Sequence, residues 1–213
     1  MIHNHDRSGW FGASDTHTIM GNWETASFMR WWMVKLGMTE RSITTPAMQA
    51  GTAYEGRILD ALGIRTRDRQ IRFRALRLRV NLDGENLQTV TEIKTFRKAP
   101  FRVSPAYWEQ CQVEMLATGK QCRIAAYQIT EAEYENYFLP VDPERITLYP
   151  IAFDISWVLE EYLPHLLYLA HCLRRRDTPT CRKFSIFTEK SRAVRLLGWL
   201  TKYLCSGPKK NTT

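Results

Sequence analysis

Apolar and basic residues alternate from residue 71 to residue 82, and strict alternation predicts a strand with one buried face. The apolar positions change phase near Ala75, which indicates a bulge or a turn within this stretch. Polar side chains of the second half share one face; they are Arg77, Arg79, Asn81 and Asp83. The stretch Asp83-Gly84-Glu85-Asn86 favours a turn, and residues 89–95 are rich in β-formers, so we predict a hairpin.

The predicted return strand also has a period of two. Val90, Glu92 and Lys94 share one face, whereas Ile93 belongs to the other. If the two strands pair as a hairpin, Asp83 lies close to Glu92. The carbonyl oxygen of Ile93 is then a further oxygen donor beside these carboxylates.

Helix signals mark most of the remaining chain. Asn22 is a candidate N-cap, Pro46 suits the first position of a second helix, and Gly119 suits the end of a third. A glycine-containing turn also leads from residue 7 into a short helix near residue 14, whose N-terminus offers backbone donors to an anion. The predicted helices span residues 23–36, 46–62, 105–118, 155–173 and 190–204, and further strands span 123–129, 134–140 and 146–153.

The helix predicted over residues 46–62 places a carboxylate on its apolar side. Met48, Glu55 and Leu62 are seven residues apart and share a stripe with Gly51 and Leu59. Burying a carboxylate is costly unless a metal ion or a hydrogen-bond network compensates it. In the alternative interpretation the stripe is rotated and Glu55 lies at its edge.

Composition narrows the class of protein. The chain has 213 residues, of which 44% are hydrophobic, enough for one compact domain with a small appendage. The formal net charge is +8, and clustered basic residues favour a polyanionic partner, with solvated surface charge as the alternative for any single cluster. No long uncharged apolar run and no apolar signal segment is evident, so we expect a soluble, cytoplasmic protein without a membrane partner.

The five cysteines include no C-x-x-C pair, which argues against a disulfide framework and against a zinc knuckle. We interpret the cysteines as buried or incidental thiols.

The spacing Asp83…Glu92-Ile93-Lys94 can hold a divalent metal against a phosphodiester. Mg²⁺ prefers carboxylate and carbonyl oxygens, and one or two such ions supply most of what phosphodiester hydrolysis needs. We expect Lys94 to orient or deprotonate the attacking water, or to stabilise the transition state, with a pKa lowered by burial. The spacing alone is a weak pattern, because a surface hairpin with an ion pair produces it as well.

Five short motifs together resemble the PD-(D/E)xK nucleases and, within them, the phage lambda exonuclease and YqaJ-like viral recombinase group. The motifs keep the family's order and approximate spacing; they are Arg7 with Gly12-Ala-Ser14-Asp15, Gly51-Thr-Ala-Tyr-Glu55, Leu82-Asp83-Gly84, Glu92-Ile-Lys94, and Gln110-Cys-Gln112 with Met115. The resemblance implies an α/β fold with a restriction-endonuclease-like core, in which helices flank a central mixed sheet. We assign residues 1–180 to a nuclease domain and residues 181–213 to a basic C-terminal helical extension, packed on it or appended to it.

The resemblance also implies a role for each motif position. The implied metal ligands are Asp83, Glu92, the Ile93 carbonyl and Glu55, and the implied catalytic set is Glu55, Asp83, Glu92, Lys94 and Gln112. Residues similar to those that hold a terminal 5′ phosphate, or that contact DNA, are Arg7, Ser14, Asn81 and Gln110. Two positions depart from the pattern, because Asn81 replaces a serine and Leu82 replaces the proline of the motif.

The implied activity is Mg²⁺- or Mn²⁺-dependent hydrolysis of double-stranded DNA from free ends, in the 5′ to 3′ direction. The implied biological setting is phage-type recombination with a single-strand annealing protein as partner, and the implied assembly is a ring-shaped trimer around DNA. Two alternatives remain: a structure- or sequence-specific endonuclease with the same site, and a non-catalytic DNA-binding protein that kept the fold. The complete carboxylate and lysine set argues against the second.

Overall fold

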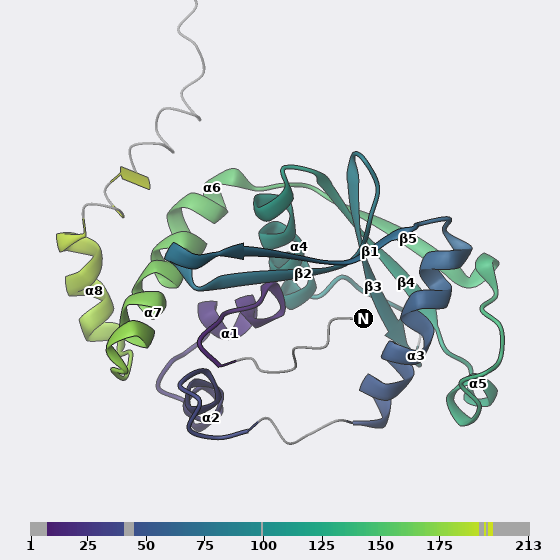
Figure 1. The fold of residues 1–213 in the computed structure, drawn as a ribbon, viewed down its shortest axis with the longest axis horizontal. Coiled ribbons are helices and arrows are strands. Elements are labelled where there is room, and N and C mark those ends of the chain that lie inside the picture. Colours follow the sequence, from purple (N-terminus) through teal and green to yellow (C-terminus); the bar gives the residue numbers. More distant parts are fainter. Residues whose placement is uncertain (1–7, 41–44, 99, 192–193, 195, 198–213) are drawn as a thin grey trace, which may run out of the picture.

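A mixed sheet of five strands lies at the centre of the computed structural model, which describes residues 8–40, 45–98, 100–191, 194 and 196–197 (Figure 1). The strands follow the order β1-β2-β3-β4-β5 and are β1 (Thr66–Phe73), β2 (Leu78–Glu85), β3 (Thr89–Phe96), β4 (Gln121–Gln128) and β5 (Ile146–Ile151). β3 and β4 are parallel, and the other neighbours are antiparallel. The predicted α/β class with a central mixed sheet is confirmed.

Helix α4 (Pro105–Thr118) is the crossover that the parallel pair β3 and β4 requires. The hydroxyl of Ser104 caps the helix by accepting a hydrogen bond from the Tyr107 N–H at 3.3 Å. Gly119 follows with a φ of +67°, a left-handed conformation that glycine adopts without strain. The prediction of a helix over residues 105–118 is confirmed at both ends.

Helices cover both faces of the sheet, so the molecule has three layers. One face is covered by α3 (Pro46–Ala61), whose buried side chains pack with Ile93, Ala125 and Tyr127 of the sheet. The other face carries a larger apolar core, built from the sheet and from α1 (Thr16–Met20), α2 (Ala26–Lys35), α4 and α7 (Leu163–Arg175). Burial of apolar side chains on both faces is the main force holding the layers together.

Helix α2 begins later than the sequence predicted. Thr25, and not Asn22, is the N-cap, because its hydroxyl accepts a hydrogen bond from the Phe28 N–H at 3.1 Å. The Asn22 side chain instead accepts from the Glu24 N–H at 2.8 Å and so closes a turn before the helix. The helix ends as predicted before Gly37, which has a φ of +68°.

The predicted turn between the arginine-rich strands is confirmed. A short 3₁₀ turn, η2 (Arg74–Leu76), joins β1 to β2, and Arg77 after it is left-handed with a φ of 52°. Across the hairpin Ile71 pairs with Val80.

The turn predicted at residues 83–86 is wrong, since β2 continues through Glu85 and the reversal follows at Asn86. Gly84 lies inside the strand for a packing reason. A Cβ at this position would lie 2.5 Å from Leu59 Cδ2 and 2.9 Å from Ile64 Cγ2. The glycine therefore allows α3 and the segment after it to approach the backbone of β2.

A strand predicted over residues 134–140 is also wrong. The chain forms α5 (Glu131–Glu135) there, followed by irregular structure up to the 3₁₀ turn η3 (Pro143–Arg145). Thr130 and Glu133 make a capping box, in which the Glu133 carboxylate accepts from the Thr130 N–H and the Thr130 hydroxyl accepts from the Glu133 N–H. This local pair outweighs the strand preference of the aromatic residues that follow.

The long helix predicted over residues 155–173 is present as three consecutive segments. They are α6 (Ile155–Trp157), a π-helical turn η4 (Val158–Tyr162) and α7. The π turn ends two residues before Pro164, which lacks the N–H that a regular helical bond requires.

A helix not predicted from the sequence, α8 (Cys181–Lys190), follows α7. Phe184 and Phe187 of α8 contact the Tyr168 ring of α7 at centroid distances of 5.4 Å. The helix predicted over residues 190–204 lies mostly outside the described residues. The division at residue 180 stays a prediction, and none of the described helices is long and apolar enough to span a membrane.

Candidate active site

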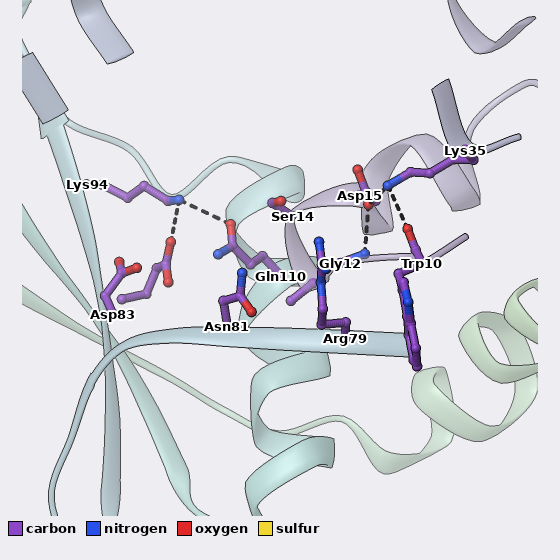
Figure 2. Close-up of a pocket in the computed structure, with 12 residues that line it drawn as sticks. Trp10, Gly12, Ser14, Asp15, Lys35, Arg79, Asn81, Asp83, Lys94 and Gln110 are labelled. Carbon is purple, nitrogen blue, oxygen red and sulfur yellow. Dashed lines mark hydrogen bonds and ion pairs between the residues drawn. The ribbon is translucent and has the colours of Figure 1, made fainter. Parts of the chain in front are cut away.

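A cavity of about 280 Å³ opens where β2, β3, α4 and the N-terminal turn meet. Its lining residues are Trp10, Gly12, Ala13, Ser14, Asp15, Lys35, Arg79, Asn81, Asp83, Glu92, Lys94 and Gln110. Figure 2 shows Asp83 and Lys94 at one end, Asn81 and Arg79 along β2, and Asp15 with Lys35 at the far end. The cavity thus joins an acidic end to a basic one.

The acidic end exists because β2 separates from β3. The two strands are paired only at Gly84 with Thr91 and at Glu85 with Val90. Beyond these pairs, the Asp83 side chain replaces a backbone partner on β2. Its Oδ2 accepts a hydrogen bond from the Ile93 N–H at 2.8 Å. Since the N–H and C=O of one strand residue point toward the same neighbour, the Ile93 carbonyl also faces Asp83.

Glu92 and Lys94 project together from β3, as the period of two predicted. Lys94 Nζ lies 2.6 Å from Glu92 Oε1 and 3.1 Å from Gln110 Oε1, and it sits 4.8 Å from the centroid of the Tyr107 ring. Glu92 is 4% exposed. Its other oxygen, Oε2, is buried and has no hydrogen-bond donor among the described residues while the neighbouring carboxyl groups are ionised.

The electrostatics around Lys94 correct one expectation from the sequence. Burial lowers the pKa of Lys94, but the charge and the hydrogen bond of Glu92 outweigh it and raise the pKa above its ordinary value. Burial likewise raises the pKa of Glu92, and the charge and hydrogen bond of Lys94 bring it below the ordinary value. The two groups form an ion pair, so Lys94 is an ammonium donor here and not the neutral amine that burial alone would favour.

The charge of Glu92 also acts on two further carboxyl groups, those of Asp83 and Glu55. Burial, followed by the charges of Glu92 and Glu55, raises the pKa of Asp83 well above its ordinary value. Burial and the charge of Glu92 raise the pKa of Glu55 to about 7. A single ammonium does not balance three carboxyl groups, so the site has an excess of negative potential.

Glu55 lies beside the cavity and does not line it. The buried stripe of α3 is formed by Ala50, Tyr54 and Ile58 with Leu59, whereas Met48 is 43% exposed. The stripe is therefore rotated from the predicted one, and Glu55 is a half-buried residue at its edge. After burial, the charge of Glu92 is the largest contribution to the raised pKa of Glu55.

The basic end of the cavity is built by the N-terminal turn and α2. Lys35, at the C-terminal end of α2, is 2% exposed, and its Nζ contacts Asp15 Oδ2 at 2.5 Å and the Trp10 carbonyl at 2.9 Å. Burial raises the pKa of Asp15, but the charge of Lys35 and hydrogen bonds from Lys35, Trp31 and Gly12 lower it overall. Arg79, 7% exposed on β2, lines the cavity beside this pair.

Of the residues predicted to bind phosphate or DNA, some line the cavity and one lies outside the described residues. Ser14 is exposed and lines the cavity, whereas Arg7 lies outside the described residues. The Gly12 N–H, one of the backbone donors expected to face an anion, donates to Asp15 Oδ2 at 2.7 Å and is therefore occupied. Asn81 lines the cavity, and its Oδ1 accepts from Gln70 Nε2 at 2.9 Å.

The catalytic role predicted for Gln112 does not fit its position. The residue is fully buried, its Nε2 donates to the Ala152 carbonyl at 2.7 Å, and its Oε1 accepts from the Asp154 N–H at 2.8 Å. Residues two apart on a helix are about 200° apart around its axis, so Gln110 and Gln112 point in opposite directions. Gln110 is the glutamine that lines the cavity, and Gln112 ties α4 to the segment before α6.

A buried cluster below the cavity was not foreseen. Glu114 of α4 is fully buried, and ligand atoms of Cys111, Glu114 and Cys122 lie within 4.8 Å of one another. Burial and the charge of Glu92 raise the pKa of Glu114 well above its ordinary value, and the pKa of the Cys122 thiol is raised too, chiefly by a hydrogen bond with Cys111 and by burial. Cys111 and Cys122 are buried free thiols, in keeping with the interpretation of these cysteines from the sequence.

The remaining described cysteines differ in exposure. Cys172 is buried, Cys181 is exposed, and Cys205 lies outside the described residues. All four described cysteines are free thiols.

Sequence signals existed for two of the three site residues that were missed. Arg79 is four residues from Asp83 and thus on the same face of β2. Glu114 follows Gln110 by four positions, the spacing of neighbours on a helix surface. No sequence pattern indicated a buried Lys35, because a lysine in the last turn of a helix is normally expected to be solvated.

Solved structures that resemble this fold include two exonucleases. A crystal structure of an alkaline exonuclease from Laribacter hongkongensis matches with a TM-score of 0.56 and 18% sequence identity, over 94% of this chain and 95% of that chain. A phage-related exonuclease from Haemophilus somnus 129PT matches with a TM-score of 0.52 and 12% identity, over 85% of this chain and 96% of that chain. At these identities the likeness establishes the fold alone. No protein family model and no curated protein sequence matches the chain.

Proposed function

We propose that this chain is a metal-dependent deoxyribonuclease of the PD-(D/E)xK type that hydrolyses double-stranded DNA from its ends. The observation that carries the proposal is the meeting of Asp83, Glu92 and Lys94 at the gap between β2 and β3, inside a cavity that becomes basic toward Arg79. The resemblance of both matched structures, each described as an exonuclease, supports the same class of activity.

The acidic end has the chemistry of a divalent cation site. Its donors are carboxylate and backbone oxygens, which suit Mg²⁺ or Mn²⁺, and its excess negative potential would be relieved by a cation. Asp83, Glu92 and the Ile93 carbonyl would hold one or two ions, with Glu55 in support. When bound, such ions supply an activated water and neutralise charge on the phosphate.

The chain's own residues supply orientation and charge. The Lys94 ammonium, fixed between Glu92 and Gln110, donates toward the phosphate oxygens or the attacking water and stabilises negative charge that develops there. The Ile93 N–H fixes the Asp83 carboxylate. This hydrogen bond keeps the aspartate aimed into the cavity, where it is needed.

The far end of the cavity favours an end of DNA over a continuous strand. Asp83 and Arg79 are four residues apart on one strand and share its cavity face with Asn81. Beyond Arg79 the cavity is bounded by the turn that carries Ser14 and by the Lys35–Asp15 ion pair. We propose that a terminal 5′ phosphate contacts Arg79 and Ser14 while the next phosphodiester lies at the acidic end, which corresponds to 5′ to 3′ degradation.

The central experiment incubates 5′-phosphorylated linear duplex DNA with Mg²⁺ and the full chain. Asp83→Ala and Lys94→Ala are expected to lose hydrolysis by about 100-fold or more, as is usual for groups that act on transition-state charge. The fully buried Gln112 offers a control, because Gln112→Met should keep activity in whatever fraction folds. Equal digestion by all variants would rule out the catalytic assignment.

Two DNA substrates test the preference for ends. Covalently closed circular DNA should stay intact, whereas its cleavage would favour the endonuclease alternative. A 5′-hydroxyl duplex should be degraded more slowly than a 5′-phosphorylated one, and Ser14→Ala with Arg79→Gln should abolish that difference. Wild-type indifference to the 5′ group would remove the proposed phosphate contact. The roles in recombination, with an annealing partner and a ring-shaped trimer, belong to this proposal through the family resemblance.

A further inference from the structure

A chain of hydrogen bonds runs from the cavity into the core below it. Lys94 Nζ donates to Gln110 Oε1 at 3.1 Å, and Gln110 Nε2 donates to Glu114 Oε1 at 2.9 Å. Cys122 Sγ in turn donates to Glu114 Oε2 at 3.6 Å. Gln110 is 8% exposed and Glu114 is fully buried, so solvent does not compete for these contacts.

The neighbours of the Gln110 amide determine which way its oxygen and its nitrogen point. An ammonium only donates hydrogen bonds, so the amide oxygen must face Lys94. The amide nitrogen must then find an acceptor on the opposite side, and Glu114 Oε1 is at that position. Without the acceptor, the amide is free to turn by 180° and present its NH₂ group to the ammonium, where two donors repel.

Burying the Glu114 carboxyl group costs folding free energy. A role in packing alone does not explain why a carboxyl group is present at this position. A carboxyl group with no exposed surface and no cation beside it loses hydration that an apolar side chain of the same size would not lose. The described ion pairs of this region are made by Glu92 and Lys94, and Glu114 is in none of them. Its hydrogen bond to Gln110 connects it to Lys94, and an apolar residue cannot supply that connection.

We propose that Glu114 is a positioning residue, which fixes the orientation of the Gln110 amide and through it holds the Lys94 ammonium against Glu92. The inference rests on the proposed hydrolytic function and adds to it a residue that touches neither DNA nor the reacting atoms. It predicts that Glu114 affects the rate of the chemical step and leaves the binding of DNA unchanged.

The experiment compares kcat and KM on 5′-phosphorylated linear duplex DNA for full-chain variants. Glu114→Met keeps the volume and removes the acceptor, and its kcat should fall about 10–100-fold, as is typical when a residue supporting a site is removed, with KM unchanged. Glu114→Gln restores one acceptor and one donor at this position and should recover most of the activity. Normal kcat and KM in folded Glu114→Met would overturn the proposal.

A double-variant comparison separates positioning from a general loss of structure. If Glu114 acts through Gln110, the pair Glu114→Met with Gln110→Ala should be no slower than Gln110→Ala alone. Independent losses that multiply would contradict the proposal. Glu133→Gln, which changes a buried carboxylate far from the cavity, should lower the thermal midpoint and leave kcat per folded molecule unchanged.

Two safeguards keep the outcomes distinct. If Glu114→Met does not fold, Glu114→Ser, which is too short to reach Gln110, replaces it with the same expected result. Wild-type hydrolysis is measured first, and its absence would overturn the proposed function together with this inference. Hydrolysis by the wild type and equally by the folded Glu114 variants would overturn this inference alone.

Discussion

At the scale of single residues, burial and mutual repulsion make ionised carboxylates at the acidic end of the cavity destabilising. Glu55 lies half-buried near Glu92, and its pKa is raised to about 7. For a carboxyl group whose pKa is raised in the folded state, the folded protein binds the proton more tightly than the unfolded chain. Its contribution to stability is present below the unfolded pKa and is lost as pH rises from about 4.5 to about 7.

Replacing Glu55 by glutamine should therefore have an effect that depends on pH. In EDTA at pH 8, Glu55→Gln should unfold at a higher temperature than the wild type, and at pH 4 the two should unfold at similar temperatures. Thermal unfolding monitored by circular dichroism checks this, with Glu24→Gln at an exposed position as control. The same difference at both pH values would contradict the proposed charge repulsion.

Lys35 and Asp15 illustrate the opposite case, a buried ion pair that holds its surroundings together. Lys35→Met should destabilise the protein by about 3–5 kcal/mol, because it leaves the Asp15 carboxylate buried without its cation. Urea unfolding measures the loss. Lys183→Met, which breaks an exposed ion pair with Asp177, is the matched control and should cost much less. Comparable losses in the two variants would show that burial does not decide the effect.

At the scale of elements, the β1–β2 ribbon has an arrangement that favours an anionic partner. Arg72 of β1 is paired directly with Arg79 of β2, and like charges opposite each other on antiparallel strands are destabilising. The next pair toward the cavity joins Gln70 to Asn81. A DNA phosphate near the two arginines would relieve their repulsion.

Arg72→Gln should weaken DNA binding without changing the chemistry, since Arg72 is exposed and does not line the cavity. We expect the slope of log K against log salt to become shallower by about 0.9, the value for one lost phosphate contact with duplex DNA. Fluorescence anisotropy in an Asp83→Ala background measures binding without cleavage. Arg182→Gln on the exposed side of α8 is the control, and an unchanged slope in Arg72→Gln would exclude the contact.

At the scale of the whole molecule, the proposed cation site joins a helix to two consecutive strands of the sheet. Glu55 comes from α3, Asp83 from β2 and Glu92 from β3, so an ion bound there would link the α3 layer to the sheet. A ligand that binds only the folded state stabilises it by mass action, by about 2.7 kcal/mol when its concentration is 100 times the dissociation constant.

Mg²⁺ or Mn²⁺ should therefore raise the thermal midpoint of the wild type, compared with sodium chloride at equal ionic strength. Glu92→Gln should lose most of this shift, because it removes a ligand, and Glu133→Gln should keep it. A shift of the same size in Glu92→Gln would place the cation elsewhere. The measurement does not depend on enzymatic activity.

Local physics explains why much of this structure could be predicted from the sequence. The helix starts at Thr45-Pro46 and Ser104-Pro105 satisfy free N–H groups within the segment itself. The strand period placed Glu92 and Lys94 on one face, and hairpin pairing brought Asp83 beside them, because side chains on a strand alternate whatever lies around it.

Only the tertiary structure decided the features that depend on contact between distant segments. The sequence predicted a turn at Gly84, but the residue lies inside a strand, where Leu59 packs against it and leaves no room for a Cβ. Gln110, and not Gln112, faces the cavity because the packing of α4 on the sheet sets its rotation. Lys35 is buried because Asp15, twenty residues earlier in the chain, compensates its charge. The sequence by itself determined which groups could perform the chemistry, and packing determined which of them meet, since burial and charge compensation are properties of the assembled layers.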